Sequence, residues 1–216
     1  ACQVENNEGT ESFDYTVEQF ADLQLLRYKV PGFDELSLQQ KKLVYYLSEA
    51  ALHGRDILFD QNGKYNLTIR KMLETVYTDY SGNRSDADFV NLEIYLKRVW
   101  FSNGIHHHYA ADKFVPGFSS EFFRKALQSV DVNKLPLSEG QTLNELCDEV
   151  FPIIFNPEVM SKRVNQSDGE DLVLTSASNY YRGVTQAEAE EFYNRMKNPN
   201  DSKPVMFGMN RKKKKK

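Results

Sequence analysis

Three consecutive histidines, His106, His107 and His108, are the first candidates for chemistry in this sequence. Neutral imidazole is a common metal ligand. Adjacent side chains, however, cannot all converge on one ion in regular structure, and zinc sites usually take ligands from successive helical turns, as in His-Glu-x-x-His. That motif does not occur in the chain. The triplet therefore favours a polar loop that lines a cleft over a metal site.

Other catalytic signatures are absent from the sequence. No serine lies in a Gly-x-Ser-x-Gly elbow, and neither a dinucleotide fingerprint nor a P-loop occurs. Glu188, Glu190 and Glu191 have the spacing of a solvated helix face. Cys147 is expected to be a buried, inert thiol, because it shares an apolar helix face with Leu143, Leu146, Val150 and Phe151. We expect no complete catalytic site within the chain.

Two segments combine aromatic and polar residues in non-repetitive stretches. In the first, 100–118, aromatic residues alternate with Asn, His, Asp and Lys, which suits either a binding loop or a well-packed connection between helices. The second, 178–185, is a turn in which Gly183 is expected to adopt positive φ and Thr185 to cap a helix. For this turn a packing role is favoured over a site.

Hydrophobic periodicity predicts a mainly α fold with a few short strands, an α+β class. Capping boxes are predicted at Thr16 with Gln19, Ser37 with Gln40, Thr142 with Glu145, and Thr185 with Glu188. Gly54 is the weak point inside the second predicted helix. The predicted helices cover about 16–30, 37–58, 67–80, 87–101, 119–130, 142–152 and 185–197, and the predicted strands cover 172–175 and 205–207.

Composition is that of a globular chain, with 40% hydrophobic and 27% charged residues in 216. We expect a flexible segment at 1–12, a helical body at 13–210, and a basic tail at 211–216 that reads as an appended tag. Without the tail, 21 basic residues face 31 acidic ones, a balance of −10. Such a body is not attracted to phosphate backbones, so nucleic acid is not an expected partner.

The two cysteines exclude a disulfide framework in a chain of this length. Cys2, which follows Ala1 and precedes a polar run, has the pattern of a lipid-modified mature end of a bacterial envelope protein and would serve as a lipid tether. No stretch approaches the roughly 20 apolar residues that span a bilayer. Any membrane association is therefore expected to be by tether.

The same segments resemble the dipeptidyl peptidase III family. The stretch Trp100-Phe-Ser-Asn-Gly-Ile-His-His-His-Tyr-Ala-Ala-Asp-Lys-Phe-Val-Pro is similar to the family pattern of an aromatic residue, Ser-Asn, Gly, an aromatic, then Asp-x-Lys-Phe-Val-Pro. Upstream, Tyr45-Tyr-Leu-Ser-Glu-Ala-Ala-Leu-His-Gly resembles its Leu-Ser-x-Ala-x-x-Tyr-Gly segment. Asn179-Tyr-Tyr-Arg-Gly-Val-Thr resembles its Thr-Tyr-aromatic-Ser-Gly-x-x-Thr turn. The order and spacing of the three agree with the family over roughly 15–210.

This resemblance implies the N-terminal, helical portion of a two-lobe zinc exopeptidase that releases dipeptides from the N-terminus of oligopeptides. In that family a His-Glu-x-x-Gly-His helix and a later glutamate hold the zinc on the other lobe, and neither motif occurs here. The implied partners are an oligopeptide substrate and the zinc-bearing lobe. The implied localisation is cytoplasmic, whereas a lipidated Cys2 would place the protein in the cell envelope.

Six residues are carried over as contributors to the substrate cleft. Tyr109 lies at or beside the aromatic position of the cleft loop, and we expect it to pack against a substrate side chain. The histidines replace less basic family residues and the loop is one residue shorter, so the alignment at Tyr109 is open by one position. The other cleft contributors are Asn103, Gly104, His108, Asp112 and Lys113.

An alternative function is an envelope-tethered helical module that binds peptides or proteins without catalysis.

Overall fold

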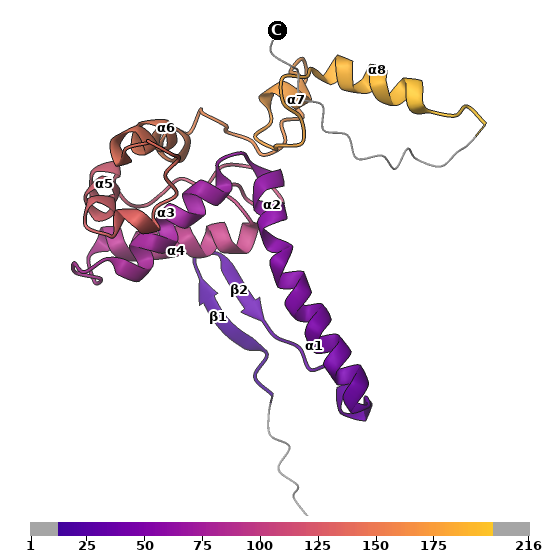
Figure 1. Cartoon of the computed structure of the whole chain (residues 1–216), viewed down its shortest axis with the longest axis horizontal. Coiled ribbons are helices and arrows are strands. Elements are labelled where there is room, and N and C mark those ends of the chain that lie inside the picture. The colour runs from indigo at the N-terminus through magenta and orange to yellow at the C-terminus, as the bar shows by residue number, and fades with distance from the viewer. Residues whose placement is uncertain (1–12, 201–216) are drawn as a thin grey trace, which may run out of the picture. The chain divides into compact units, whose positions relative to one another are not determined.

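The computed structural model describes residues 13–200 and divides into two compact units, the first ending at Glu49 and the second beginning at Ala50. Over these residues the fold is mainly helical with a single two-stranded sheet, which confirms the predicted class (Figure 1). Four expectations lie outside the described residues: the flexible segment 1–12, the tether at Cys2, the strand 205–207 and the tail 211–216.

The helix predicted from residue 16 is wrong, because an antiparallel hairpin forms there. Strand β1 (Thr16–Phe20) pairs with β2 (Leu23–Leu26), and Ala21 takes a left-handed φ of 49° in the turn between them. The Thr16 hydroxyl accepts a hydrogen bond from the Gln24 amide across the hairpin at 3.1 Å instead of capping a helix. Apolar residues spaced three apart fit two short strands as well as one helix, so the tight turn decides between them.

A short 3₁₀ helix, η1 (Phe33–Glu35), and helix α1 (Leu38–His53) follow the hairpin. The predicted capping box before α1 is confirmed: the N–H of Ser37 donates to the Gln40 side chain at 2.9 Å, and the N–H of Gln40 donates to Oγ of Ser37 at 3.3 Å. The predicted weak point is also confirmed, since α1 ends immediately before Gly54.

The second unit is built on five packed helices, α2 to α6. Helix α3 (Asn66–Asp79) packs on α2 (Arg55–Asn62), α4 (Ala87–Ser102) and α5 (Ser120–Gln128), and α5 packs on α6 (Leu143–Phe155) after the short η2 (Val132–Lys134) (Figure 1). Cys147 is fully buried in this core, as expected, and burial raises the pKa of its thiol. Fully buried side chains that form the core include Phe59, Ile69, Leu73, Leu96, Phe123 and Ile154.

The strand predicted at 172–175 is wrong, because these residues form the one-turn helix α7 (Leu172–Thr175). The carboxylate of Asp171 accepts from the N–H groups of Val173 and Leu174 at 2.9 Å each, which is a helix N-cap. Its second oxygen accepts from the N–H of Gln186 at 3.0 Å, at the start of α8 (Gln186–Met196). One capping carboxylate therefore overrides the strand preference of four apolar and β-branched residues.

The capping boxes predicted before α6 and α8 are both confirmed. Thr142 and Glu145 exchange the two expected hydrogen bonds, and Thr185 and Glu188 do the same. Three of the four predicted capping boxes therefore lie at the start of a helix.

Within residues 13–200, no helix is both long enough and apolar enough to cross a bilayer.

Candidate functional site

The loop singled out by the sequence begins where α4 ends in a left-handed turn. Asn103 has a φ of 52°, and the N–H of Gly104 donates to the carbonyl of Val99 at 3.0 Å. Gly104 itself is buried at a φ of 150°. A Cβ added to Gly104 would lie 2.3 Å from Nδ2 of Asn66, so only glycine fits here.

A buried amide, that of Asn66 at the start of α3, fixes this end of the loop. Asn66 is 1% exposed; its Nδ2 donates to the carbonyl of Phe59 at 3.1 Å, and its Oδ1 accepts from the N–H of Ile105 at 3.3 Å. Nearby, the amide of Asn62 donates to the carbonyl of Asn103 at 3.1 Å. The loop is therefore held against the corner between α2 and α3 by two side-chain amides.

The far side of the loop is paired with the segment 156–163, which follows α6. The N–H of Lys113 donates to the carbonyl of Ser161 at 3.0 Å, and the N–H of Arg163 donates to the carbonyl of Ala111 at 2.8 Å. The Asp112 carboxylate forms an ion pair with Lys162. Asp112 therefore joins two segments 50 residues apart.

Lys113 directs its ammonium group at the end of α6. Nζ donates to the carbonyl of Ile153 at 2.9 Å and also to the carbonyls of Asn156 and Val159. Carbonyl groups at a helix C-terminus lack intrahelical donors, and a cation there is stabilised by them and by the helix dipole. Burial lowers the pKa of the Lys113 ammonium. Lys113 thus has a structural role in the loop, because its ammonium group donates its hydrogen bonds to backbone carbonyls.

His106 is a buried structural residue at the base of the loop. It is 2% exposed, and its Nε2 lies 2.7 Å from the carbonyl of Met160. This contact requires a proton on Nε2, so the neutral ring leaves Nδ1 unprotonated. Burial is the largest cause that lowers the pKa of His106, to about 4; the charges of Lys113 and Arg163 lower it further.

The tip of the loop presents three rings in sequence. The rings of His107 and His108 are stacked with centroids 4.5 Å apart, and the Tyr109 ring lies 4.4 Å from that of His108. Tyr109 is 87% exposed. Nδ1 of His107 accepts from the N–H groups of Tyr109 and Ala110 at 3.2 and 3.0 Å, which fixes the turn. Stacked rings do not converge on one ion, and among residues 13–200 no three His, Cys, Asp or Glu side chains are grouped to hold a metal.

The six cleft residues from the sequence therefore fall into three places on one ordered loop. Asn103 and Gly104 lie against the corner of α2 and α3, Asp112 and Lys113 lie against 153–163, and only His108 and Tyr109 lie at the tip. Sequence reasoning missed the residues that hold the loop. Arg163 is one of them, because its guanidinium donates to the carbonyl of His108 at 2.9 Å; the others are Asn62 and Asn66.

The turn at 178–185 makes contacts of a packing element. The N–H of Asn179 donates to the carbonyl of Gln61 at 2.8 Å, so the turn is tied to the end of α2. Gly183 has a φ of 64°, which confirms the expected positive value. The hydroxyls of Tyr181 and Tyr193 lie 3.3 Å apart, and burial and this contact raise the pKa of Tyr181 to about 12.

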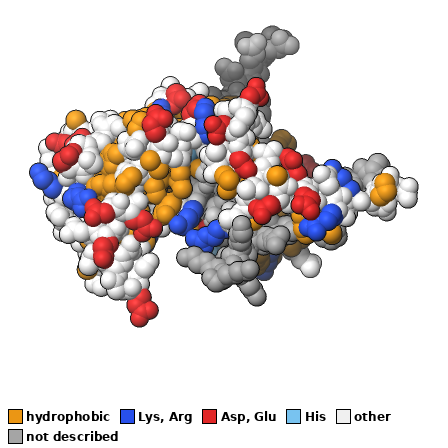
Figure 2. All heavy atoms as spheres, turned by 90° about the horizontal axis from the view of Figure 1, so that it is seen from above, with side chains coloured by type: hydrophobic (Ala, Val, Ile, Leu, Met, Phe, Trp, Pro, Cys, Tyr) orange, Lys and Arg blue, Asp and Glu red, His pale blue; other side chains and the backbone are white. Residues whose placement is uncertain are grey.

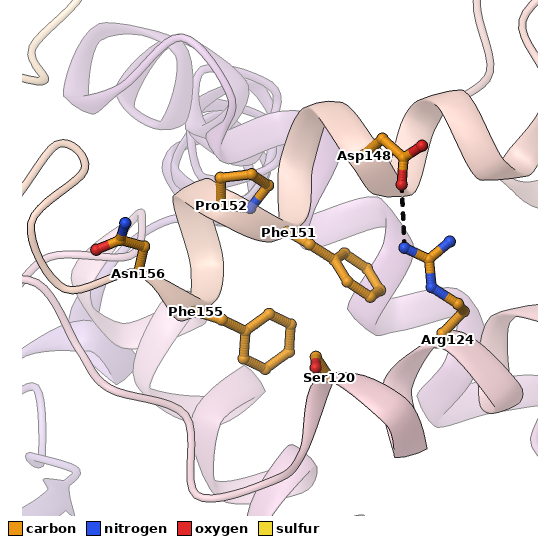
Figure 3. Close-up of a pocket in the computed structure, with 7 residues that line it drawn as sticks. All are labelled: Ser120, Arg124, Asp148, Phe151, Pro152, Phe155 and Asn156. Carbon is orange, nitrogen blue, oxygen red and sulfur yellow. Dashed lines mark hydrogen bonds and ion pairs between the residues drawn. The ribbon is translucent and has the colours of Figure 1, made fainter.

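A second concave feature, not foreseen from the sequence, lies between α5 and α6. It is an open groove of about 440 Å³ with the rings of Phe151 and Phe155 on its floor (Figure 3). The guanidinium of Arg124 forms an ion pair with Asp148 at 3.1 Å and lies 4.9 Å from the centroid of the Phe151 ring. Figure 2 shows hydrophobic side chains gathered on one face and bordered by charged residues. The remaining lining residues are Ser120, Pro152 and Asn156.

Neither the comparison with protein-family models nor the comparison with curated proteins found a match for this sequence.

Proposed function

We propose that this chain is the N-terminal part of a zinc-dependent dipeptidyl peptidase, in which it contributes one wall of the peptide-binding cleft. The observation that carries the proposal is the loop after α4. It contains the longest of the family-like motifs, and hydrogen bonds hold it on both sides while Tyr109 stays exposed at its tip. A rigid loop with a protruding aromatic ring suits contact with a peptide side chain, because little ordering entropy remains to be lost on binding.

The zinc and its ligands belong, on this proposal, to polypeptide outside this sequence. The described residues do not fit a zinc site: His106 is buried against a carbonyl, and Nδ1 of His107 accepts two backbone N–H groups. When bound in the other lobe, zinc would activate water and polarise the scissile carbonyl. The role left to this chain is to bind and orient the peptide.

The decisive experiment compares this chain with the longer gene product. Supplied with zinc, the 216-residue chain should release no dipeptide from a dipeptidyl naphthylamide or a short peptide, whereas the longer protein should do so. Turnover by the chain alone would overturn the proposal. A longer gene product without a His-Glu-x-x-Gly-His helix would overturn it equally.

Replacement of Tyr109 by alanine tests its role in binding. In the longer protein, Tyr109→Ala should lower kcat/KM by roughly 5- to 30-fold, mainly through KM, because a buried aromatic contact with substrate is worth about 1–2 kcal/mol. The free energy of unfolding of this chain should change by less than about 0.5 kcal/mol, since the ring is exposed. Val115→Ala, an exposed position in the same loop, is the matched control and should leave both quantities unchanged.

A second candidate function is peptide or protein binding without catalysis, and the groove between α5 and α6 favours it. Its aromatic floor and the rim charges of Arg124 and Asp148 suit an apolar peptide segment. Phe155→Ala should then weaken binding of such a peptide in calorimetry, while Tyr109→Ala should not. The reverse result would favour the peptidase proposal.

A further inference from the structure

The loop after α4 is attached on two sides by groups of different chemistry. On the side of α2 and α3, the neutral side-chain amides of Asn62 and Asn66 hold it. On the other side, which we call the junction, residues 106–113 meet residues 156–163 through backbone hydrogen bonds and the side chain of His106. Amides keep the same protonation state in the physiological pH range, whereas imidazole does not. The two attachments therefore respond differently to acid.

Two residues of the junction have a backbone conformation that a side chain disfavours. Ala111 has a φ of 62° and Met160 a φ of 51°, in the left-handed region where Cβ is crowded. The carbonyl of each accepts a hydrogen bond from the opposite segment. That of Ala111 accepts from the N–H of Arg163 at 2.8 Å, and that of Met160 from Nε2 of His106 at 2.7 Å. Such conformations persist where surrounding contacts hold them, so opening of the junction would relieve strain at both residues.

The ring of His106 is the buried side-chain contact of the junction. It is 2% exposed, whereas His107 and His108 are half-buried at the tip. The proton on Nε2 is donated to the carbonyl of Met160, and Nδ1 has no hydrogen-bond partner among the described residues. A second proton, on Nδ1, would create a charge cut off from water. The charged ring is hydrated only if it leaves its position in the junction.

The charges around the ring act mainly against its protonation. Burial is the largest effect that lowers the pKa of His106, to about 4. The cations Lys113 and Arg163 lower it further, whereas Asp112 raises it. The Asp112 carboxylate is already paired with Lys162. The charged side chains of the junction and of the adjoining end of α4 are Asp112, Lys113, Glu158, Lys162, Arg163 and Arg98.

We propose that the junction is an acid-released contact, in which a proton on Nδ1 of His106 separates residues 106–113 from 156–163 while the helical core stays folded. The hydrogen bonds of Asn62 and Asn66 do not involve the histidine, so the start of the loop remains in place. Local opening of this kind, below the free energy of global unfolding, is common in folded proteins. The inference does not rest on the proposed function. In the proposed peptidase, release would displace Tyr109 and weaken peptide binding in acid.

Amide hydrogen exchange, followed by NMR on this chain, tests the release without any substitution. The N–H groups of Lys113 and Arg163 cross the junction, whereas that of Ile105 donates to Asn66 on the other side of the loop. Relative to their intrinsic rates, the amides of Lys113 and Arg163 should exchange about 20-fold faster at pH 5 than at pH 7, as follows when a pKa of about 4 returns to 6.5. At pH 5 the amide of Ile105 should remain at least 100-fold better protected.

Two outcomes of the exchange experiment would overturn the inference. Equal protection of the Ile105 and Lys113 amides at pH 5 would mean that the second unit opens as a whole. Protection of Lys113 that does not change between pH 7 and pH 5 would mean that the junction does not respond to acid.

Two substitutions assign the release to the histidine. His106→Gln keeps a donor for the carbonyl of Met160 but does not titrate, so the acceleration at the Lys113 amide should vanish. Asp112→Asn removes the carboxylate of the ion pair and keeps the histidine, so the acceleration should persist. Acceleration kept in His106→Gln, or lost in Asp112→Asn, would contradict His106 as the trigger.

The ¹⁵N chemical shifts of the wild-type ring provide a test that needs no folded variant. At pH 7 they should show a proton on Nε2 of His106 and none on Nδ1, because Nε2 donates to the carbonyl of Met160. A ring that carries a proton on Nδ1 at pH 7 would overturn the inference, since the buried site would then already accept what acid is proposed to supply.

Discussion

Gly104→Ala is expected to lower the free energy of unfolding of the second unit by about 3 kcal/mol or more. The new Cβ would lie 2.3 Å from Nδ2 of Asn66, far inside van der Waals contact. The amide cannot move away cheaply, because it is buried and donates to the carbonyl of Phe59 while accepting from Ile105. Displacing it would leave buried polar groups unpaired, and a φ of 150° would strain the alanine as well.

Gly140→Ala separates the collision from the backbone strain. Gly140 also has positive φ, at 74°, but a Cβ there would meet nothing within 4 Å. This control should cost only about 1 kcal/mol. Urea unfolding followed by the fluorescence of Trp100, the one tryptophan in the sequence, measures both. If the two variants lose the same free energy of unfolding, contact with Asn66 is not what requires glycine at position 104.

Local signals in the sequence were sufficient where one short motif decides the structure. The capping boxes at Ser37, Thr142 and Thr185 correctly start three helices, and the end of α1 falls at Gly54. Each of these depends on hydrogen bonds or backbone freedom within four residues, which a single sequence contains. The boundaries of the loop after α4 were predictable for the same reason.

Predictions failed where a more distant group decides the structure. The capping pattern at Thr16 is present in the sequence, yet its hydroxyl bonds to Gln24 across a hairpin. The apolar run 172–175 is a helix because the Asp171 carboxylate caps it and also binds the start of α8, 15 residues away. Residue spacing alone does not reveal which of two local patterns such a contact will favour.

In the candidate site, too, local features could be predicted from the sequence and distant contacts could not. The sequence identified the loop and its exposed aromatic residue, but not what holds the loop in place. Asn66 is 39 residues before Ile105, and Arg163 is 55 residues after His108. A lone asparagine or arginine carries no signal of such a contact. Gly104 was the nearest available clue, since a glycine at a helix end often marks a close approach of another chain segment.

Acid should destabilise the second unit through His106. The folded state holds the neutral ring, with a pKa of about 4, whereas the unfolded chain has the ordinary value of 6.5. The unfolded state therefore binds more protons between these values, and the free energy of unfolding falls as the pH drops through this window. From pH 7 to pH 5 the loss attributable to His106 should be about 2 kcal/mol, approaching about 3 kcal/mol near pH 4.

The physical cause of this loss lies at Nδ1. Nε2 already donates to the carbonyl of Met160, so the second proton must enter a buried position that has no hydrogen-bond acceptor among the described residues. The resulting charge would also face the cations Lys113 and Arg163, which the Met160 carbonyl and the Asp112 carboxylate oppose only in part. Burial and like charge therefore act in the same direction.

His106→Gln removes the titration and keeps a donor for the Met160 carbonyl. The variant should lose stability at pH 7, because the glutamine fills the buried site imperfectly, but its free energy of unfolding should fall about 2 kcal/mol less than that of the wild type between pH 7 and pH 5. His53→Gln, which removes an exposed histidine, should keep the wild-type dependence. Urea titrations at pH 5, 6 and 7 measure these slopes. If His106→Gln and the wild type show the same slope, the acid sensitivity arises from other groups.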